Sequence, residues 1–308
     1  MNFEEIIVEL SHNCNLNCIM CGFGKDANPP DKNKFMSFEK YRAILYQIGN
    51  LTKNIRLNGR GESTIHPEFI HILDYTKKSF PHLNINLFSN LSFNEEKIIN
   101  SIKKNSVQLF ISIDSPDKEE LSKIRKGADF NLIMKNIESV KHIRNRPFIV
   151  FTIQEANILR IADIGRFASV NGCHIIYNTV RRDQGIEDFV LAVKNNLSKI
   201  QRQFNEVLSI YKNSDLRCMI PDQISGVELS FKDAVQTHGT MNTCPALMNE
   251  LCVLYDGVVT PCNMFNPYIY GNIFEQSLND IWTDSYRLNF LRDYRGHYYC
   301  KNCANLGL

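Results

Sequence analysis

The sequence predicts an α/β fold in which a partial barrel of six β/α units precedes a small α+β domain. Short apolar, β-branched runs recur along the first part of the chain, and a segment with helical periodicity follows each of the first five. Such runs are typical of strands buried on both faces of a parallel sheet. Near the C-terminus, a predicted hairpin flanked by cysteines indicates the second, smaller domain.

Six strands are expected in the barrel. They span residues 5–10, 54–58, 83–88, 107–113, 148–153 and 173–177. Their alternation with helices implies right-handed crossovers and a curved parallel sheet. In an α/β barrel the chemistry lies where the strands end. The residues directly after each strand are therefore the first candidates for a site.

The expected helices span residues 37–48, 67–78, 95–104, 129–143, 157–171 and 186–211. Ser37 is an expected N-cap, and Pro67 stands in a first turn, where its missing N–H does no harm. Asn94 is the expected N-cap of the third helix, and Gly172 ends the fifth. The long amphipathic helix at 186–211 is interpreted as a packing element between the two domains.

The composition excludes several classes of protein. The 308 residues are enough for one large α/β domain and a small one. A net charge of +2 gives no electrostatic reason to expect nucleic acid, and no apolar run is long enough for a membrane span. The N-terminus lacks the features of a signal peptide, so we expect a cytoplasmic protein. In such a chain the ten cysteines favour metal binding or redox chemistry over disulfides.

Three cysteines directly follow the first strand: Cys14, Cys18 and Cys21, in the spacing C-x3-C-x2-C. Three thiolates are one fewer than a closed zinc site or a fully ligated 4Fe-4S cluster requires. In a cluster they would leave one iron open to a small molecule. The alternative is a zinc ion with His12 as a local fourth ligand. The triplet alone does not separate these two metal sites.

Three more segments with candidate site residues lie at expected strand ends. Asn58-Gly59-Arg60-Gly61-Glu62 follows the second strand, and its glycines allow the backbone to approach a ligand closely. Ser89-Asn90 follows the third strand. Ser112 and Asp114 end the fourth strand, and Arg125-Lys126-Gly127 comes shortly after. A turn or a helix cap is the alternative role for Asp114.

Taken together, these motifs resemble those of the radical S-adenosylmethionine (SAM) superfamily over residues 1–178. The resemblance implies that the triplet holds a 4Fe-4S cluster whose open iron chelates the amino and carboxylate groups of SAM. It implies these further SAM-binding residues: Met20, Asn58, Gly59, Gly61, Glu62, Ser89, Asn90, Ser112, Asp114 and Arg125. The glycines of the family's motif are usually adjacent, whereas Arg60 separates them in this chain.

A second set of cysteines, Cys244, Cys262, Cys300 and Cys303, lies near the C-terminus. The first two flank a predicted hairpin with an Asp-Gly turn. By spacing alone, four thiolates suit a zinc ion or a cluster. The order C-x12-G-x4-C, Gly-Asn-Ile, a Leu-x-x-Ile-Trp helix and C-x2-C resembles the twitch domain, a shortened SPASM domain. This resemblance implies an auxiliary 4Fe-4S cluster held by all four cysteines.

The remaining cysteines are Cys173, Cys218 and Cys252. Cys173 and Cys252 lie in expected strands and are interpreted as small core residues, whereas Cys218 is expected in a loop. The expected domains are 1–180 for the radical SAM barrel, 181–243 for a mainly helical connector and 244–308 for the twitch domain.

The resemblance implies an enzyme that reductively cleaves SAM to a 5′-deoxyadenosyl radical, which abstracts a substrate hydrogen. Because an auxiliary cluster is a natural electron acceptor, we expect an oxidoreductase that dehydrogenates a hydroxyl-bearing carbon of a small sugar, polyol or aminocyclitol. A flavodoxin or ferredoxin is the expected electron donor. Arg181, Arg182 and Asp183 follow the sixth strand and are the catalytic candidates, for binding a polar substrate or moving a proton. A solvated loop is their alternative role.

Three alternative functions stay open at this point. A radical epimerase would return a hydrogen to the substrate from a protein thiol, with Cys218 as the candidate. A peptide-modifying maturase would use the same cofactors on a different substrate. A zinc or iron–sulfur binding protein without enzymatic activity would use both cysteine sets structurally.

Overall fold

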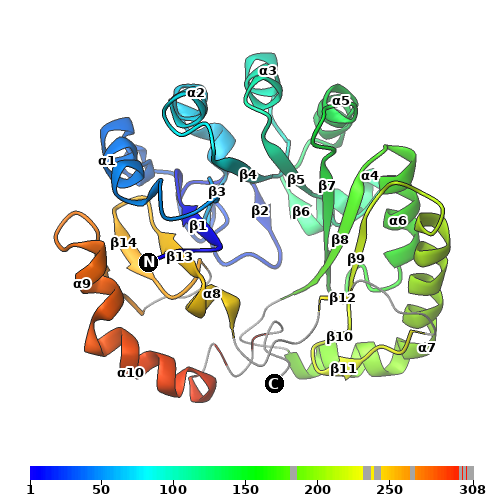
Figure 1. Ribbon diagram of the computed structural model, residues 1–308. Coiled ribbons are helices and arrows are strands. Elements are labelled where there is room, and N and C mark those ends of the chain that lie inside the picture. Colours follow the sequence, from blue (N-terminus) through cyan, green and yellow to red (C-terminus); the bar gives the residue numbers. More distant parts are fainter. Residues whose placement is uncertain are drawn as a thin grey trace.

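An open sheet of eleven strands forms the core of the fold, in the order β12-β9-β8-β7-β5-β4-β3-β1-β13-β14-β15. The computed structural model describes residues 1–180, 186–231, 237–238, 244–263, 268–297, 300 and 303. Figure 1 shows the strands as an arc with helices around its outer side. The fold is therefore a mixed α/β structure with a large, mostly parallel sheet, as the sequence predicted.

All six strands expected in the barrel are present, and neighbours among them pair in parallel. They are β1 (Glu5–Val8), β3 (Asn54–Arg56), β4 (Asn84–Ser89), β5 (Gln108–Ser112), β7 (Phe148–Ile153) and β8 (His174–Thr179). β7 has the predicted bounds, and the ends of the other strands differ by one or two residues. Because these strands are parallel, their C-terminal ends share one edge of the sheet.

Helices cover the outer face of the arc (Figure 1). They are α1 (Phe38–Ile48), α2 (Phe69–Ser79), α3 (Glu96–Lys104), α5 (Phe130–Val140), α6 (Ile161–Val170) and α7 (Ile186–Tyr211). Ser37 caps α1 by accepting a hydrogen bond from the backbone N–H of Lys40. The cap predicted at Asn94 is wrong, because Glu95 is the N-cap of α3 and makes no side-chain capping bond. None of the described helices is long and apolar enough to cross a membrane.

Side chains alternate between the two faces of the sheet. Phe151 and Tyr177 face the helices, where the ring of Tyr177 lies 5.2 Å from that of Phe204 in α7. Phe148 and His174 are an odd number of residues away from Phe151 and Tyr177 on the same strands, so they lie on the opposite, concave face. Their rings are tilted to each other, with 4.6 Å between centroids. The concave face, away from the helices, is therefore the inner wall of the partial barrel.

The C-terminal hairpin continues this sheet. β13 (Glu250–Val253) pairs in parallel with β1 and antiparallel with β14 (Val258–Thr260), and β15 (Gly271–Asn272) adds to β14. Gly257 makes the predicted turn between β13 and β14, with a φ of +89° that favours glycine. The second domain therefore begins directly against the first strand of the barrel.

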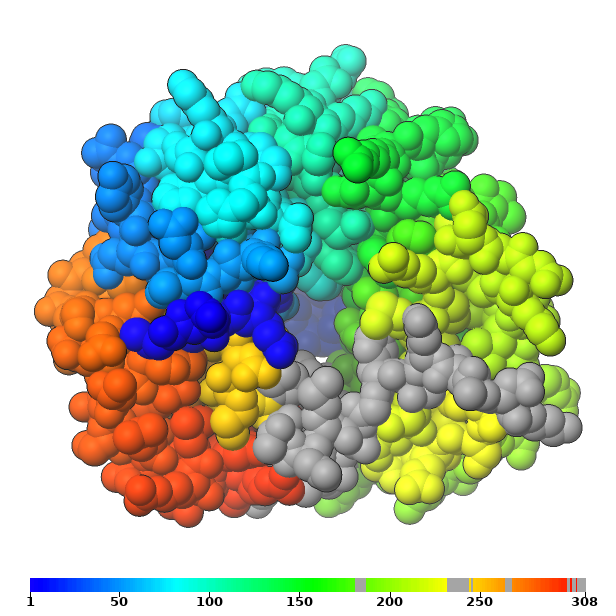
Figure 2. Space-filling view, in the orientation of Figure 1, coloured from blue at the N-terminus to red at the C-terminus, as the bar shows by residue number. Residues whose placement is uncertain are grey.

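Three helices complete the C-terminal part: α8 (Pro245–Met248), α9 (Leu278–Thr283) and α10 (Ser285–Asp293). The ring of Trp282 in α9 meets that of Phe3 edge to face, with 4.7 Å between centroids. In Figure 2 the N-terminal residues (blue) lie beside the orange and red C-terminal residues on one face of the molecule. The N-terminal residues thus pack against helix α9 beside β1 and β13.

The segment between the expected domains contributes strands as well as α7. β9 (Cys218–Pro221) extends the sheet in parallel beside β8, so the loop predicted at Cys218 is wrong. Cys218 pairs with Ile175, a residue of the core between sheet and helices. The shorter strands are β2 (Asn17–Cys18), β6 (Arg125–Lys126), β10 (Gln223–Ile224), β11 (Val227–Glu228) and β12 (Thr237–His238). The domain boundaries themselves stay predictions.

Candidate iron–sulfur and SAM site

The first cysteine set, Cys14, Cys18 and Cys21, lies in the loop that follows β1. Within this loop β2 pairs antiparallel with β6, which places Cys18 opposite Arg125. The 7-residue helix α4 (Lys118–Ile124) leads directly into β6. Two segments that are far apart in the sequence therefore meet at the C-terminal edge of the sheet.

Each sulfur atom of the first set accepts a hydrogen bond. The backbone N–H of Leu16 donates to Cys14 Sγ and that of Phe23 to Cys21 Sγ, each at 3.4 Å. Arg125 Nη1 donates to Cys18 Sγ at 3.9 Å. Donors aimed at sulfur favour thiolates, which are the ligands of iron–sulfur clusters.

Burial raises the pKa of the Cys14 thiol to about 12. The hydrogen bond from the backbone N–H of Leu16 lowers the pKa of Cys14 in return, and a bound metal would favour the thiolate further. No three His, Cys, Asp or Glu side chains of the described residues are arranged to hold a single metal ion. Thiolates of a 4Fe-4S cluster each bind a different iron, so they need not converge on one point. The donor set of the loop thus fits a cluster better than a lone zinc ion.

Asp114 and Arg125 form a buried ion pair behind this loop. Arg125 Nε lies 2.7 Å from Asp114 Oδ2, and the backbone N–H of Thr152 donates to Oδ1 at 2.7 Å. Burial raises the pKa of Asp114, and the guanidinium of Arg125 lowers it in return. Asp114 thus holds the Nε side of the Arg125 guanidinium, while Nη1 donates to Cys18 Sγ. The turn or cap role considered for Asp114 is not what the structure shows.

Gly59 and Gly61 let the turn after β3 lie against the chain just before Cys14. A Cβ at Gly61 would come within 2.3 Å of the carbonyl oxygen of Asn13, and one at Gly59 within 2.7 Å of Glu9 Cβ. The backbone N–H of Glu62 donates to that same oxygen of Asn13 at 2.8 Å. The two glycines are therefore required by close backbone approach, even though Arg60 separates them.

Glu62 is the centre of a buried hydrogen-bond network. Its Oε1 accepts from the hydroxyls of Thr64 and Ser89, at 2.7 and 2.9 Å, and its Oε2 accepts from the backbone N–H of Asn90 at 2.9 Å. Burial raises the pKa of Glu62, and these donors oppose the shift. The Asn90 side chain donates to Asn15 in the cysteine loop at 2.9 Å. The network thus joins the ends of β3 and β4 to the first cysteine set.

The other residues predicted for SAM binding lie nearby along the same edge. Asn58 is buried, and its side-chain oxygen accepts from the backbone N–H of Phe88 at 3.2 Å. Ser112 ends β5, and Met20 packs partly buried against the core. The catalytic candidates Arg181, Arg182 and Asp183 lie outside the described residues.

The second cysteine set, Cys244, Cys262, Cys300 and Cys303, gathers beside the hairpin. Burial raises the pKa of Cys300 to about 12, with further contributions from Cys262, Cys244 and Cys303. Those contributions place the other three thiols within electrostatic reach of Cys300. Cys244 precedes β13 and Cys262 follows β14, as the sequence predicted, and the short helix α8 lies between Cys244 and β13. Four neighbouring thiols are the donor set of a fully ligated cluster or a structural zinc.

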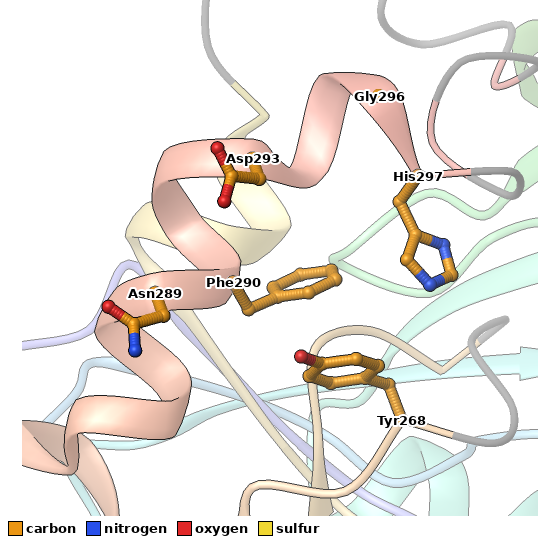
Figure 3. Close-up of a pocket in the computed structure, with 6 residues that line it drawn as sticks. All are labelled: Tyr268, Asn289, Phe290, Asp293, Gly296 and His297. Carbon is orange, nitrogen blue, oxygen red and sulfur yellow. The ribbon is translucent and has the colours of Figure 1, made fainter.

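A small hollow of about 400 Å³ lies next to this second set. Figure 3 shows Phe290 from α10 with Tyr268 and His297 around it, and Asn289, Asp293 and Gly296 along its rim. The ring of Tyr268 lies 4.4 Å from that of Phe290. The backbone N–H of Cys300 donates to the carbonyl of His297 at 3.0 Å. The hollow is therefore lined by three aromatic side chains and lies next to the turn that leads to Cys300.

Sequence reasoning missed Glu9, which is fully buried near the end of β1. Its carboxylate accepts from the backbone N–H of Arg60 at 2.7 Å and from that of Tyr255 at 3.4 Å, and contacts His12 Nδ1 at 3.2 Å. The available signal was a single acidic residue inside an apolar strand. Such a residue indicates hydrogen-bond partners nearby, because buried carboxylates are normally paired or hydrogen-bonded.

These features define an α/β protein with two groups of thiols suited to metal binding. One group follows β1, and the other lies around the hairpin of β13 and β14. Comparison with known proteins agrees with this class. Residues 8–193 match the family described as the Radical SAM superfamily, and residues 244–304 match the SPASM iron-sulfur cluster-binding domain. The chain belongs to the radical SAM superfamily, and its cofactors are SAM and two 4Fe-4S clusters.

Relatives with similar sequences carry out several kinds of modification. The tungsten-containing aldehyde ferredoxin oxidoreductase cofactor-modifying protein of Pyrococcus furiosus is 23% identical, covering 98% of this chain and 87% of that protein. The antilisterial bacteriocin subtilosin biosynthesis protein AlbA of Bacillus subtilis is 26% identical, covering 89% and 58%. The AdoMet-dependent heme synthase of Methanosarcina barkeri is 24% identical, covering 92% and 83%.

Solved structures share the fold. anSMEcpe with bound AdoMet has a TM-score of 0.74 at 18% identity, covering 99% of this chain and 84% of that one. Streptococcus suis SuiB bound to S-adenosylmethionine also has a TM-score of 0.74, at 15% identity, covering 99% and 72%. BtrN in complex with AdoMet and 2-DOIA has a TM-score of 0.55 at 18% identity, covering 99% and 95%.

Proposed function

We propose that this radical SAM enzyme is an oxidoreductase that converts a hydroxyl-bearing carbon of a small sugar, polyol or aminocyclitol to a carbonyl. When bound, SAM and the first cluster supply a 5′-deoxyadenosyl radical, and the auxiliary cluster supplies an acceptor for one electron. The substrate carbon gives up a hydrogen atom, its hydroxyl gives up a proton, and one further electron leaves. The net change is a two-electron oxidation of C–OH to C=O.

The observation that carries this proposal is the closeness of the two cysteine sets. β1 leads into the first set and pairs in parallel with β13, while the antiparallel neighbour of β13, β14, leads into the second set, so the two sets belong to neighbouring strands. Arg60, beside the first set, donates from Nε to the carbonyl of Asn263, the residue after Cys262, at 3.0 Å. Electron transfer weakens steeply with distance, so neighbouring sets favour an auxiliary cluster that takes part in the reaction.

In this proposal the chain's own residues bind and orient the cofactors. The first cysteine set holds one cluster and the second set holds the other. Arg125, fixed by Asp114, supports the thiolate of Cys18. Glu62 fixes Ser89 and Asn90 at the edge where the SAM methionyl group is expected. The ion pair and the network are rigid because all of their members are largely buried.

The catalytic candidates keep the roles predicted from the sequence. Arg181, Arg182 and Asp183 follow directly after β8 and Val180. In the proposed reaction the arginines bind the polar substrate and Asp183 accepts the hydroxyl proton. A flavodoxin or ferredoxin is the proposed source of the electron that starts the reaction.

The positions of the remaining thiols favour oxidation over epimerisation. Burial and the nearby Cys218 both raise the pKa of Tyr177 and of Tyr211, so Cys218 lies on the helix side of the sheet. Cys173 is fully buried, and Cys252 is covered by its apolar neighbours. An epimerase needs a thiol that reaches the substrate, whereas Cys173 and Cys252 are buried and Cys218 is partly buried on the helix side of the sheet.

A second candidate function is modification of a peptide or a protein-bound cofactor. The relatives include a cofactor-modifying protein and a bacteriocin biosynthesis protein. SuiB bound to the precursor peptide SuiA is among the similar structures, with a TM-score of 0.66. These likenesses favour the same radical chemistry on a larger substrate.

Anaerobic reconstitution tests the proposal. We expect about eight irons per chain, from two 4Fe-4S clusters, and 5′-deoxyadenosine when SAM and a strong reductant are added. A panel of polyols and aminocyclitols deuterated at their hydroxyl-bearing carbons should transfer deuterium to 5′-deoxyadenosine and yield a ketone. Tightly bound zinc without SAM cleavage would contradict the proposed enzymatic activity. Deuterium transfer only from peptides would favour the second candidate function, modification of a peptide.

A further inference from the structure

The side chain of Arg60 lies between the two cysteine sets. Its Nε donates to the backbone carbonyl of Asn263 at 3.0 Å, directly after Cys262. Its guanidinium also lies over the ring of Phe23, 5.1 Å from the ring centroid. Phe23 in turn donates its backbone N–H to Cys21 Sγ. One side chain therefore contacts neighbours of a proposed ligand in each set.

Glu9 holds the backbone of Arg60 in place. The backbone N–H of Arg60 donates to Glu9 Oε1 at 2.7 Å, and Gly59 packs on the side chain of the same glutamate. Glu9 also accepts from the backbone N–H of Tyr255, at the turn between β13 and β14. A single buried carboxylate thus fixes the position of Arg60 relative to both parts of the protein.

A second contact between the two parts runs beside Arg60. The rings of His12 and Tyr255 stack with 5.4 Å between centroids, and His12 also meets Phe23 edge to face at 5.8 Å. His12 precedes the first set, and Tyr255 belongs to the hairpin that carries the second. The layer formed by His12, Phe23, Arg60 and Tyr255 is continuous packing between the two sites.

We propose that Arg60 is a positioning residue that clamps Asn263, the residue after Cys262, onto Phe23 in the loop after Cys21 and places a permanent positive charge beside both clusters. This rests on the proposed assignment of the two cysteine sets. A guanidinium is always charged, stacks on aromatic rings and donates in a fixed plane, whereas a lysine keeps only the charge. Nearby positive charge stabilises the more negative, reduced state of a cluster.

The clamp is tested by hydrogen–deuterium exchange on the anaerobic holoprotein. In Arg60→Ala and in Arg60→Lys we expect exchange to rise together, by about tenfold, in peptides containing residues 21–24 and 262–263, because a charge-assisted hydrogen bond and the stacking are lost. Arg42→Ala is the control, since Arg42 is an exposed arginine on α1 that pairs with Glu39 on the same helix. Unchanged exchange in either loop of Arg60→Ala overturns the clamp.

The charge is tested by redox titration of the auxiliary cluster followed by EPR. Arg60→Ala should make reduction less favourable by about tenfold, which is about 59 mV for one electron. Arg60→Lys should keep most of the reduction potential of the auxiliary cluster, because the charge stays, while losing the contacts of the clamp. This variant also replaces Arg60→Ala in the exchange measurement if Arg60→Ala does not fold. An unchanged potential in Arg60→Ala with full iron content overturns the role of the charge. A wild type without an auxiliary cluster would instead contradict the proposed function. The two failures are distinguishable, because hydrogen–deuterium exchange reports on the polypeptide and the redox titration reports on the cluster.

Discussion

The two cysteine sets differ in how the chain brings them together. The first set comes from one loop of 8 residues, from Cys14 to Cys21. Two of its sulfurs accept hydrogen bonds from nearby backbone N–H groups, those of Leu16 within the stretch and Phe23 two residues after it. The second set is spread over 60 residues, from Cys244 to Cys303. Its members approach one another only because β13, β14 and the C-terminal helices pack around them.

The difference predicts different modes of failure. A loop site depends on local backbone geometry and on the few groups that anchor the loop, which are here the Asp114–Arg125 pair and the Glu62 network. A dispersed site depends on every contact that holds its elements in register. Changes remote from the second set should therefore disturb it more than equally remote changes disturb the first.

Removing one ligand from each set is the most direct comparison and has the largest expected effect. Cys18→Ala should abolish 5′-deoxyadenosine formation, because it removes a ligand of the proposed SAM-binding cluster, and should leave about half of the iron. Cys262→Ala should also lose about half of the iron but keep SAM cleavage without forming oxidised product. Iron analysis and chromatography of 5′-deoxyadenosine measure both. Continued SAM cleavage by Cys18→Ala would refute the assignment of the first set.

Asp114→Asn tests whether the ion pair organises the first site. The change leaves Arg125 as a buried charge without its partner, which should cost about 3–5 kcal/mol of unfolding free energy. Anaerobic guanidinium unfolding measures this cost. Asp117→Asn is the control, because an asparagine can still accept the capping bond from the backbone N–H of Glu120, and it should cost less than about 0.5 kcal/mol. Equal losses of unfolding free energy in the two variants would show that the ion pair does not stabilise the first site.

Glu62→Ala tests the hydrogen-bond network of the first site. Losing a charge-assisted bond to the SAM amino group, together with the anchor of Asn90, should weaken SAM binding by about 10- to 150-fold, or about 1.5–3 kcal/mol. Both clusters should stay intact, as iron content shows. Equilibrium dialysis with labelled SAM gives the affinity. An affinity equal to that of the wild type would leave Glu62 with a purely structural role.

Arg287→Met probes a remote support of the second site. Arg287 is buried and donates to the carbonyls of Trp282 and Leu247, at 2.8 and 3.3 Å, which ties α10 to α9 and α8. We expect a loss of about 1.5 kcal/mol of stability and faster loss of the auxiliary cluster to a chelator, with the first cluster unaffected. Arg292→Met, on the exposed side of the same helix, should change neither rate. Equal loss of both clusters would show that the two sites fail together.

Cys218→Ala should have the smallest effect, because this thiol lies on the helix side of the sheet. The variant should bind both clusters and form product at nearly the wild-type rate. A wild-type reaction in D2O is the independent measurement, and a dehydrogenase should place no solvent deuterium on a product carbon. Deuterium at carbon, or a variant that cleaves SAM without forming product, would favour the epimerase.

Much of the barrel could be read from the chain because its signals are local. The apolar run at 148–153 gave the bounds of β7, and the amphipathic period at 186–211 gave those of α7. The first cysteine set and the Asp256-Gly257 turn are likewise short patterns whose geometry needs few distant contacts. Local patterns failed at Asn94, where the helix begins after Glu95 although Glu95 makes no capping bond, and at Cys218, where pairing with β8 makes the segment a strand.

Short-range chemistry in the sequence determined the strands and helices of the barrel, the thiols available to metals and the position of the first set at a strand end. Only the tertiary structure decided that β13 pairs with β1, that Glu9 serves both domains and that Arg60 reaches Asn263. These contacts join residues about 50 to 250 positions apart. No local propensity specifies such a pairing, because its free energy comes from burial and hydrogen bonds that exist only once the sheet has assembled.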